Sequence, residues 1–468
     1  MRTEALSFEN LTGDRIARIT EACTLCGKCF EACPMVPYSP AKGAEPEAVV
    51  RSVIDLLNGR PHAPAGAAWA EACQKSGVCI EACPEDVNPR EMLLYAKLKL
   101  QREKQGPEER AGVSRDYFQI LSRTIRLMSA IQLEPGLWRR LTAVRGGKKQ
   151  GTEAVFYFGC NILQTPHILL SCLDVFDRLG LDYEVAGGVG HCCGVNPIRR
   201  GDLEAGAAMG AKSLGHFRSY NPGRVITFCP TCQMQYTEYM PLYASAGLRL
   251  AGGHGADGAG EALAFVHITQ YLAENVDRLR ALFVRPVRKR AAVHLHGGVP
   301  GVERNLRKVL AAVPGLEVAE IDQLSSHGYQ CPTLVLPEAK AAMRERLLAS
   351  ARAAGVDSLL TVYHSCHREL CGEEGSGHFR VENFMSILGE AMGFEYPDWT
   401  KTFKLYEDMD RVLAEADGLL RAHGIEPEGA REALQAALYG APRPAARARG
   451  GGAPPAMARI GIDTAPIS

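Results

Sequence analysis

Cysteine spacing is the feature that most constrains what this chain can fold into. The chain has 468 residues and 16 cysteines, and twelve of these cysteines fall into two compact layouts. The first layout comprises Cys23, Cys26, Cys29, Cys33, Cys73, Cys79 and Cys83. The second comprises Cys160, Cys192, Cys193, Cys229 and Cys232. Thiolates grouped in this way are typical of iron–sulfur ligation, so the sequence predicts a protein that moves electrons one at a time.

Composition and charge narrow the class of protein further. Acidic and basic residues balance at 53 each, which gives no electrostatic case for a nucleic-acid partner or an anionic membrane surface. No run approaches the roughly 18 apolar residues that span a bilayer, and the first 20 residues lack the apolar core of a secretory signal. We therefore expect a cytoplasmic protein whose thiols serve metal or redox chemistry, held peripherally at the inner membrane face if a partner is membrane-bound.

The first layout predicts two small clusters. In Cys-x2-Cys-x2-Cys-x3-Cys-Pro, three thiolates on a tight loop take three irons, and the fourth cysteine binds a second cluster. Crossing the ligands in this way predicts a [4Fe-4S] cluster held by Cys23, Cys26, Cys29 and Cys83. The second cluster would be held by Cys33, Cys73 and Cys79.

Position 76 decides the type of the second cluster. It is Ser76, whose hydroxyl is a poor ligand at neutral pH, so we expect a [3Fe-4S] cluster there. Two alternatives stay open: a [4Fe-4S] cluster with a labile iron on Ser76, and a bacterial-type ferredoxin in which Ser76 is incidental.

The N-terminal part of the chain has helical periodicity. Residues 45–59 carry apolar side chains at helical spacing and end at Gly59, and residues 90–103 predict another helix. We expect a helical ferredoxin-type domain over 1–103. A polar helical connector would follow over 104–150 and end in the basic stretch 145–149, which is either solvated or a docking edge.

From residue 154 the pattern changes to alternating strands and helices. Strands are predicted at 154–158, 181–186 and 224–228, with helices at 165–180 and 202–217. This is the pattern of an α/β unit with a parallel sheet, over 151–250. The five cysteines of the second layout follow these strands, so we expect them to gather at the carboxyl edge of the sheet.

The same pattern returns 134 residues later. Strands are predicted at 291–295, 316–321 and 358–363, and the motif positions keep an ungapped register. The matched pairs are Cys160 with His294, Cys192 with Ser326, Cys193 with His327, Gly194 with Gly328, Cys229 with Tyr363 and Cys232 with Cys366. A register shared by three segments indicates an internal duplication, with the second copy over 262–400. We expect a flexible loop at 251–261 and a disordered tail over 440–468.

The fold class predicted is therefore α+β multidomain: an N-terminal helical two-cluster ferredoxin domain followed by a duplicated, Rossmann-like α/β cysteine-rich domain. The second copy keeps one cysteine of five, Cys366. The replacing residues His294, His327 and Tyr363 can also bind a metal, and three further histidines lie close in sequence: His296, His364 and His367. A mononuclear metal site and a structural half-domain are both open. Of the remaining thiols, Cys172 suits helix packing, and Cys331 and Cys371 have no clear role.

Two resemblances add to these expectations. The run Cys73-x5-Cys79-x3-Cys83-Pro, followed by Asn88-Pro89, resembles iron–sulfur subunits of succinate dehydrogenase and fumarate reductase, which implies one [4Fe-4S] and one [3Fe-4S] cluster. The pattern Cys-x31-Cys-Cys-Gly-x34-Cys-x2-Cys resembles the cysteine-rich domain of heterodisulfide reductases, and the domain order over 20–375 resembles their D subunit. That resemblance implies a non-cubane [4Fe-4S] cluster on Cys160, Cys192, Cys193, Cys229 and Cys232. A zinc site and an empty thiol cluster are the alternatives.

Two functions are expected on these grounds. The first is a heterodisulfide-reductase-like iron–sulfur oxidoreductase in a multisubunit complex, whose non-cubane cluster acts on a thiol or disulfide. The second is an electron relay from a flavoprotein dehydrogenase of glycolate, lactate or glycerol-3-phosphate type to a quinone or membrane cytochrome. The sequence has no flavin or nicotinamide fingerprint, so both functions need redox partner subunits.

Overall fold

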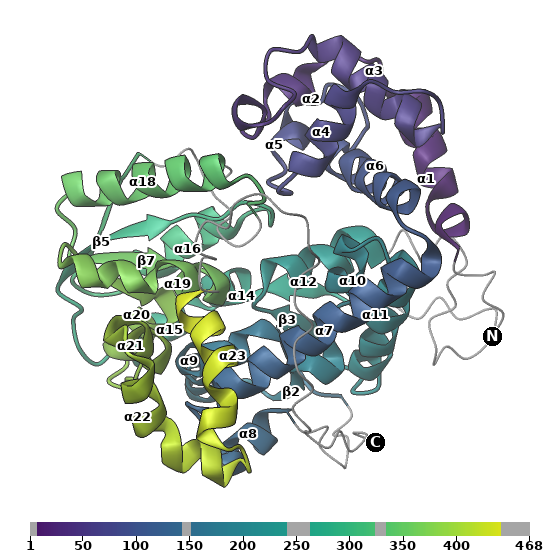
Figure 1. Ribbon diagram of the computed structural model, residues 1–468. Helices are drawn as coiled ribbons and strands as arrows, with labels where there is room; N and C mark the ends of the chain where they lie inside the picture. The colour runs from purple at the N-terminus through teal and green to yellow at the C-terminus, as the bar shows by residue number, and fades with distance from the viewer. Residues whose placement is uncertain (1–6, 143–150, 241–262, 323–333, 441–468) are drawn as a thin grey trace.

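The computed structural model describes residues 7–142, 151–240, 263–322 and 334–440. A helical N-terminal module leads into two α/β units, and helices complete the C-terminal side (Figure 1). Several positions discussed above lie outside the described residues: the basic stretch 145–149, the loop 251–261, Ser326, His327, Gly328, Cys331 and the tail after residue 440. Within the described ranges no helix combines the length and apolar character needed to cross a bilayer.

The N-terminal module is helical, as predicted. Its helices are α1 (Phe8–Ala22), α2 (Lys28–Glu31), α3 (Pro46–Leu57), α4 (Pro64–Ala72), α5 (Val78–Glu81) and α6 (Pro89–Lys104). The Asn88 side chain accepts a hydrogen bond from the Glu91 N–H at 3.1 Å, and Pro89 is the first residue of α6. Gly59, with φ of 67°, follows α3 and confirms the expected end of that helix. The core of the module includes Val53 and Trp69, both fully buried.

The predicted connector contains a long packed helix. Helix α7 (Pro107–Ala130) is followed by α8 (Pro135–Thr142). The last turns of α7 bury Ile125, Leu127 and Met128, whereas most of its first half is exposed. This apolar end explains why the segment packs against the α/β units rather than serving as a loose link.

The first α/β unit is built on a four-stranded parallel sheet. Its strands are β1 (Ala154–Gly159), β2 (Tyr183–Gly187), β3 (Arg224–Thr227) and β4 (Phe265–His267), in the order β2-β1-β3-β4. Its helices are α9 (Pro166–Leu179), α10 (Val195–Arg199), α11 (Leu203–Arg218), α12 (Pro230–Met234), α14 (Ile268–Glu274) and α15 (Val276–Leu282). All six residues of β1 are buried, as expected for a central parallel strand covered on both faces.

The second α/β unit has a sheet of the same strand order. Its strands are β5 (Lys289–His294), β6 (Leu316–Ala319), β7 (Ser358–Thr361) and β8 (Arg380–Asn383), all parallel and in the order β6-β5-β7-β8. Its helices are α16 (Val302–Leu310), α18 (Pro337–Ala353), α19 (His364–Leu370) and α20 (Phe384–Ala391). Three strands in each unit were predicted from the sequence, and the short fourth strands, β4 and β8, were not.

The C-terminal helices were not anticipated by the sequence analysis. They are α21 (Trp399–Tyr406), α22 (Met409–Ala422) and α23 (Pro427–Tyr439). Buried residues of all three form one apolar cluster with Leu127, Met128 and Ile131 at the end of α7. In Figure 1, α23 lies alongside α7, so the C-terminal segment packs against a helix that precedes both α/β units.

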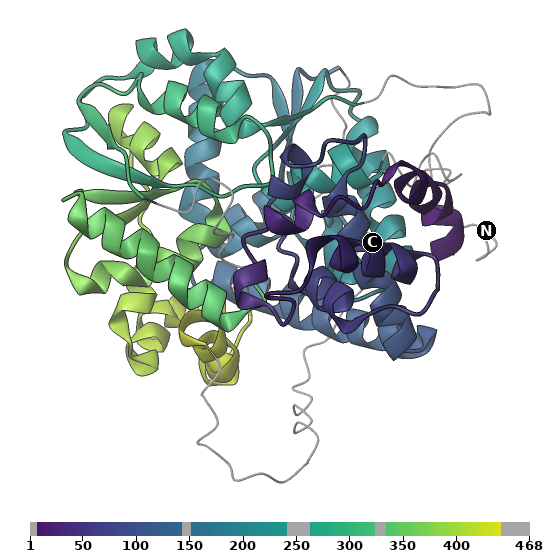
Figure 2. The same ribbon diagram turned by 90° about the horizontal axis from the view of Figure 1, so that it is seen from above.

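The N-terminal module lies over the first α/β unit. Figure 2, the view from above, shows its helices covering that unit while the second unit extends to one side. The side chain of Gln101 on α6 donates to the Arg199 carbonyl at 2.9 Å, and Arg102 pairs with Glu204 at 2.8 Å. One apolar cluster includes residues of both parts, such as Trp69 and Ile198. The two cysteine layouts therefore sit in modules that pack directly on each other.

Candidate iron–sulfur centres

The two cysteine loops of the N-terminal module have the same backbone form. Leu25 and Lys75 both adopt positive φ, 63° and 68°, and each lies two residues before a glycine of positive φ, Gly27 or Gly77. Each loop then enters a four-residue helix, α2 or α5. By this match Ser76 occupies in the second loop the place that Cys26 occupies in the first.

The first set of four thiols lies together, as expected if the last cysteine of each motif binds the cluster of the other motif. Cys23, Cys26, Cys29 and Cys83 line one small cavity. Burial raises the pKa of the Cys29 thiol to about 12, with smaller contributions from the nearby Cys23, Cys83 and Cys26. Cys26 is the exposed member of the set. This set therefore has one side open to solvent.

The second set, Cys33, Cys73 and Cys79, also lies together. Burial raises the pKa of Cys79, and Cys73 and Cys33 raise it further. Burial likewise raises the pKa of Cys33, and the nearby Trp69 side chain offsets part of that shift. Cys29 of the first set also contributes to the raised pKa of Cys79, so the two sets are neighbours.

The loop of the second set faces the first α/β unit. Cys73 and Lys75 line a cavity of about 370 Å³ together with Asn196 and Arg199 of that unit. The Lys75 ammonium lies 5.1 Å from the ring centroid of Tyr239. Burial, followed by repulsion from Arg199, lowers the pKa of Lys75 to about 7. The second set is therefore on the side of the N-terminal module that meets the cysteine-rich unit.

Arg90 joins three segments at this contact. Its guanidinium donates to the Lys75 carbonyl and to the Gly298 carbonyl, each at 3.1 Å, and forms an ion pair with Glu238. The Arg90 side chain is only 4% exposed, so this charge is removed from water and depends on those partners. Sequence reasoning missed Arg90, because its partners lie 15 to 208 residues away.

The five cysteines of the second layout gather at the carboxyl edge of the first sheet. Cys160 directly follows β1, Cys192 and Cys193 lie in the loop after β2, and Cys229 and Cys232 flank the start of α12. The Sγ atoms of Cys193 and Cys232 are 3.5 Å apart, and Cys192 lies within hydrogen-bonding reach of Cys160. Four of the five are buried, and Cys229 is half-buried.

The electrostatics of this cluster favour a bound cation. The hydrogen bond with Cys192 raises the pKa of Cys193, which reaches about 12, while the pKa of Cys232 is raised by its bonds with Cys193 and Cys229. The bond from Cys232 lowers the pKa of Cys229. Five thiols in one buried site cannot all ionise without compensating positive charge, and metal binding supplies such charge while releasing the protons.

Glycines make room for this site. A Cβ on Gly159, where φ is 78°, would lie 3.2 Å from the Cys232 sulfur. A Cβ on Gly194, where φ is 82°, would lie 1.8 Å from the Gly206 carbonyl oxygen on α11. The cysteine loops therefore come close to neighbouring elements in a way that side chains would prevent. The donor set and the space fit a bulky iron–sulfur core.

The second α/β unit brings three of the expected metal-binding residues together. Ligand atoms of His294, His296 and Cys366 all lie within 4.8 Å of one another, and all three residues are buried. Tyr363 packs edge-on against His296, with ring centroids 5.1 Å apart. Burial raises the pKa of Tyr363, and both Cys366 and Cys229 raise it further. Tyr363 therefore lies between the two sheet edges. His327 lies outside the described residues.

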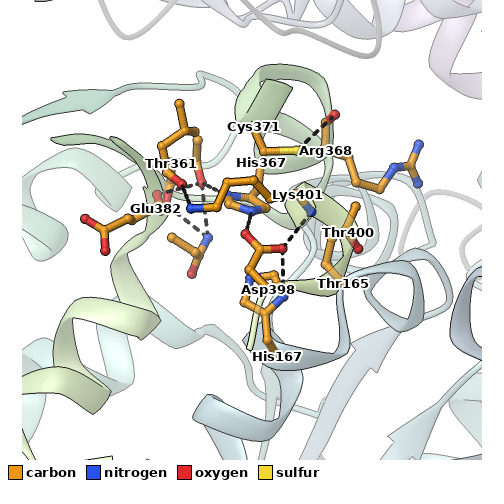
Figure 3. A network of polar contacts seen from close by, with 12 residues as sticks. Thr165, His167, Thr361, His367, Arg368, Cys371, Glu382, Asp398, Thr400 and Lys401 are labelled. Carbon is orange, nitrogen blue, oxygen red and sulfur yellow. Dashed lines mark hydrogen bonds and ion pairs between the residues drawn. The ribbon is translucent and has the colours of Figure 1, made fainter. Parts of the chain in front are cut away.

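His364 and His367 do not join that group. His364 contacts the Phe228 ring, with centroids 6.0 Å apart. His367 points into a separate polar network (Figure 3). There its Nε2 lies 2.6 Å from Asp398, which also lies 3.5 Å from His167. Burial alone would raise the pKa of Asp398, but His367 and His167 lower it overall.

This network links the two α/β units. His167 comes from α9, His367 from α19 and Asp398 from the start of α21. Nothing in the local sequence could have connected His167 with Asp398, because the signal is spatial.

The leftover thiols have separate environments. Cys172 on α9 is fully buried, and burial alone raises its pKa, as expected for a packing residue. Cys371 is also buried, with a pKa raised to about 12 by burial. Neither belongs to any of the three thiol sets described above.

Comparisons with known proteins agree with these sites. Residues 22–88 match the 4Fe-4S dicluster domain family, and residues 154–237 match the cysteine-rich domain family known as CCG. The chain is 24% identical over 259 residues to the B subunit of fumarate reductase (CoM/CoB) from Methanothermobacter marburgensis, covering 52% of this chain and 47% of that protein. It is 23% identical over 257 residues to the D subunit of dihydromethanophenazine:CoB–CoM heterodisulfide reductase from Methanosarcina barkeri, covering 52% and 59%.

The chain spans about half the length of the curated relatives it matches. Both matched domains coincide with the cysteine layouts, the first in the N-terminal module and the second on β1, β2 and β3. The chain thus joins a 4Fe-4S dicluster domain to a CCG cysteine-rich domain, and it is a low-identity homologue of the heterodisulfide reductase D subunit and the fumarate reductase B subunit.

Proposed function

We propose that this chain is a heterodisulfide-reductase-like oxidoreductase subunit. It would pass electrons between two clusters in the N-terminal module and a non-cubane [4Fe-4S] cluster in the first α/β unit, where a thiol or disulfide reacts. The observation that carries the proposal is the spatial order of the three thiol sets. The set with exposed Cys26 adjoins the set with Cys79, and the loop of that second set meets the cysteine-rich unit at Lys75 and Arg90.

Each thiol set would hold one cluster. Cys23, Cys26, Cys29 and Cys83 would hold a [4Fe-4S] cluster. Cys33, Cys73 and Cys79 would hold a [3Fe-4S] cluster, because Ser76 stands where a fourth thiolate is needed. Cys160, Cys192, Cys193, Cys229 and Cys232 would hold the non-cubane cluster. When bound, these groups supply one-electron carriers and an iron that accepts a substrate thiolate.

The protein's own residues control access to the third site. Cys160, Cys192, Cys193 and Cys232 are buried, so water is kept from most of the set, whereas Cys229 is half-buried. Cys229 also has the lowered pKa within the set, caused by the hydrogen bond from Cys232. We therefore place the substrate-facing side of the site at Cys229, next to Tyr363.

The decisive experiment separates disulfide reduction at the five-cysteine site from the redox state of the N-terminal clusters. Cys193→Ser should abolish disulfide reduction by the assembled complex while sparing the electron paramagnetic resonance (EPR) signals of the N-terminal clusters. Cys172→Ser is the matched control, because Cys172 is equally buried and lies outside the five-cysteine set. Turnover that survives in Cys193→Ser with the non-cubane signal gone would refute the proposal.

One observation favours a second function, electron relay alone. The second α/β unit keeps only Cys366 of the five cysteines, which argues against a mechanism that needs two equivalent clusters. In this case the chain would link a flavoprotein dehydrogenase to a quinone or membrane cytochrome, at the inner face of the membrane. The relay function predicts that a quinone analogue rapidly oxidises the reduced chain and that disulfides do not react with it.

We also propose that the two α/β units arose by duplication. The shared strand order β2-β1-β3-β4 and β6-β5-β7-β8 supports this, as does the ungapped register of the motif positions. His294 is the last residue of β5, and its counterpart Cys160 directly follows β1. Cys366 lies a few residues after β7, in the same way that Cys232 lies a few residues after β3. Divergence would then have replaced four of the five thiols of the second copy, two of them with imidazoles.

A further inference from the structure

We propose that the second α/β unit binds a single divalent transition-metal ion of the zinc class through His294, His296 and Cys366. The three side chains offer two imidazole nitrogens and one thiolate, with ligand atoms mutually within 4.8 Å. In a tetrahedral zinc site, metal–nitrogen bonds of about 2.0 Å and a metal–sulfur bond of about 2.3 Å place these ligand atoms roughly 3.3–3.5 Å apart. A shift of about an ångström would close the site.

The backbone preorganises this group. His294 is the last residue of β5, and His296 lies two residues further along the chain, where its ligand nitrogen comes within 4.8 Å of that of His294. Cys366 lies in the first turn of α19, directly after β7, which pairs with β5 in parallel register. The Nδ1 atom of His296 is already 3.1 Å from the Cys366 sulfur. The three ligands therefore converge from two adjacent strand ends at the carboxyl edge of the sheet.

The donor set selects the metal. Imidazole and thiolate suit Zn²⁺ better than Mg²⁺ or Ca²⁺, which prefer oxygen ligands. Among the described residues three side chains offer ligands, which leaves one tetrahedral position for a water molecule or an exogenous ligand, as in catalytic rather than structural zinc sites. A purely structural site would be expected to supply a fourth side chain.

Tyr363 gives an independent reason to expect a ligand at this position. Its ring packs on His296, and its hydroxyl is buried without a hydrogen-bond partner among the described residues. A buried hydroxyl left unpaired costs free energy, so a partner that arrives with a bound metal or its fourth ligand would satisfy it. Cys229 also contributes to the raised pKa of Tyr363, so the three-ligand group lies near the five-cysteine site.

The metal site does not depend on the proposed activity, because all its ligands come from the second α/β unit. The test uses the full-length protein with its iron–sulfur clusters, produced with zinc in the medium and purified anaerobically. Metal analysis should give about one zinc per chain in addition to iron. His296→Ala and Cys366→Ser should lose this zinc and keep the iron, whereas Cys371→Ser, a buried control on the same unit, should keep both.

X-ray absorption at the zinc edge uses only the wild-type protein, so it tests the proposal even if the variants fail to fold. The proposal predicts a mixed shell of two nitrogens at about 2.0 Å and one sulfur at about 2.3 Å, with one further light atom. A shell composed of sulfur alone would mean that zinc occupies the cluster cysteines, and it would overturn the proposal. Wild-type protein without zinc, or full zinc retention in both ligand variants, would overturn it as well.

Discussion

At the scale of single residues, we propose that Ser76 determines whether the second N-terminal site holds three irons or four. The matching backbone of its loop with that of Cys26 places a hydroxyl where the first loop has a thiol. Ser76→Cys should therefore complete a [4Fe-4S] cluster, raise the iron content by about one per chain and remove the EPR signal of an oxidised three-iron cluster.

The reverse change is the matched control for that prediction. Cys26→Ser should remove one iron from the first cluster and create a second three-iron signal. A three-iron signal that persists unchanged in Ser76→Cys would contradict the assignment of Ser76 to the second cluster.

Buried histidines make stability depend on pH. Burial lowers the pKa of His267 to about 4, although its hydrogen bond with the Phe228 carbonyl opposes the shift. An unfolded histidine titrates near about 6.5, so below that pH the unfolded chain binds the extra proton and the folded state loses stability down to about pH 4. His267→Asn should flatten the fall in melting temperature over this range. The exposed variant His378→Asn should keep the wild-type slope, and equal slopes in all three proteins would refute this explanation.

At the scale of elements, close approach between the Cys192–Cys193 loop and α11 positions the five-cysteine site. Gly194→Ala forces a Cβ to within 1.8 Å of the Gly206 carbonyl at a positive φ, which should cost at least about 1–3 kcal/mol and displace Cys193. We expect a lower melting temperature and loss of the non-cubane signal. Gly190→Ala has nothing within 4 Å of the added Cβ and should leave both unchanged. Equal behaviour of the two variants would contradict this account.

Elements with strong local periodicity were predictable from the sequence. The continuous apolar run of β1 and the amphipathic pattern of α9, which ends at Gly180, gave the correct structure type with errors of a few residues. The strands β4 and β8 were missed because neither precedes a position of the cysteine register, which helped to locate the similarly short β3 and β7. Helices α22 and α23 also carry apolar residues at helical spacing, such as Met409, Val412, Leu413 and Ala416 in α22, so their existence was predictable from the sequence. Their packing against α7 was not, because it joins segments far apart in the chain.

The residues of the candidate sites likewise divide into those that the sequence predicts and those that only the structure reveals. The grouping of the seven N-terminal cysteines followed from their spacing. The grouping of the five later cysteines followed from topology, because loops at the carboxyl edge of a parallel sheet must meet. Arg90 and the pair His167 and Asp398 could not be predicted, because each acts through partners far away in the sequence. His327 was matched to Cys193 by register and lies outside the described residues, so its role stays a prediction.

At the scale of the whole molecule, Arg90 holds the N-terminal module against the cysteine-rich unit. Arg90→Gln leaves Glu238 in a desolvated contact without its cation, a loss of about 3–5 kcal/mol for buried pairs. The variant should keep its clusters and show slower electron transfer from the N-terminal clusters to the third site, followed by freeze-quench EPR. Arg15→Gln breaks a pair with Glu91 inside the N-terminal module and is the matched control. Equal transfer rates in both variants would show that the Arg90 contact does not control the rate of electron transfer between the two modules.

The measurement that tests the central claim most directly is anaerobic EPR, as isolated and after dithionite reduction, with iron and sulfide counted on the same sample. Two four-iron clusters and one three-iron cluster predict about 11 irons per chain, with a three-iron signal in the oxidised state. About 8 irons with no three-iron signal would contradict the account of three clusters in series, because one of the thiol sets would then hold no cluster.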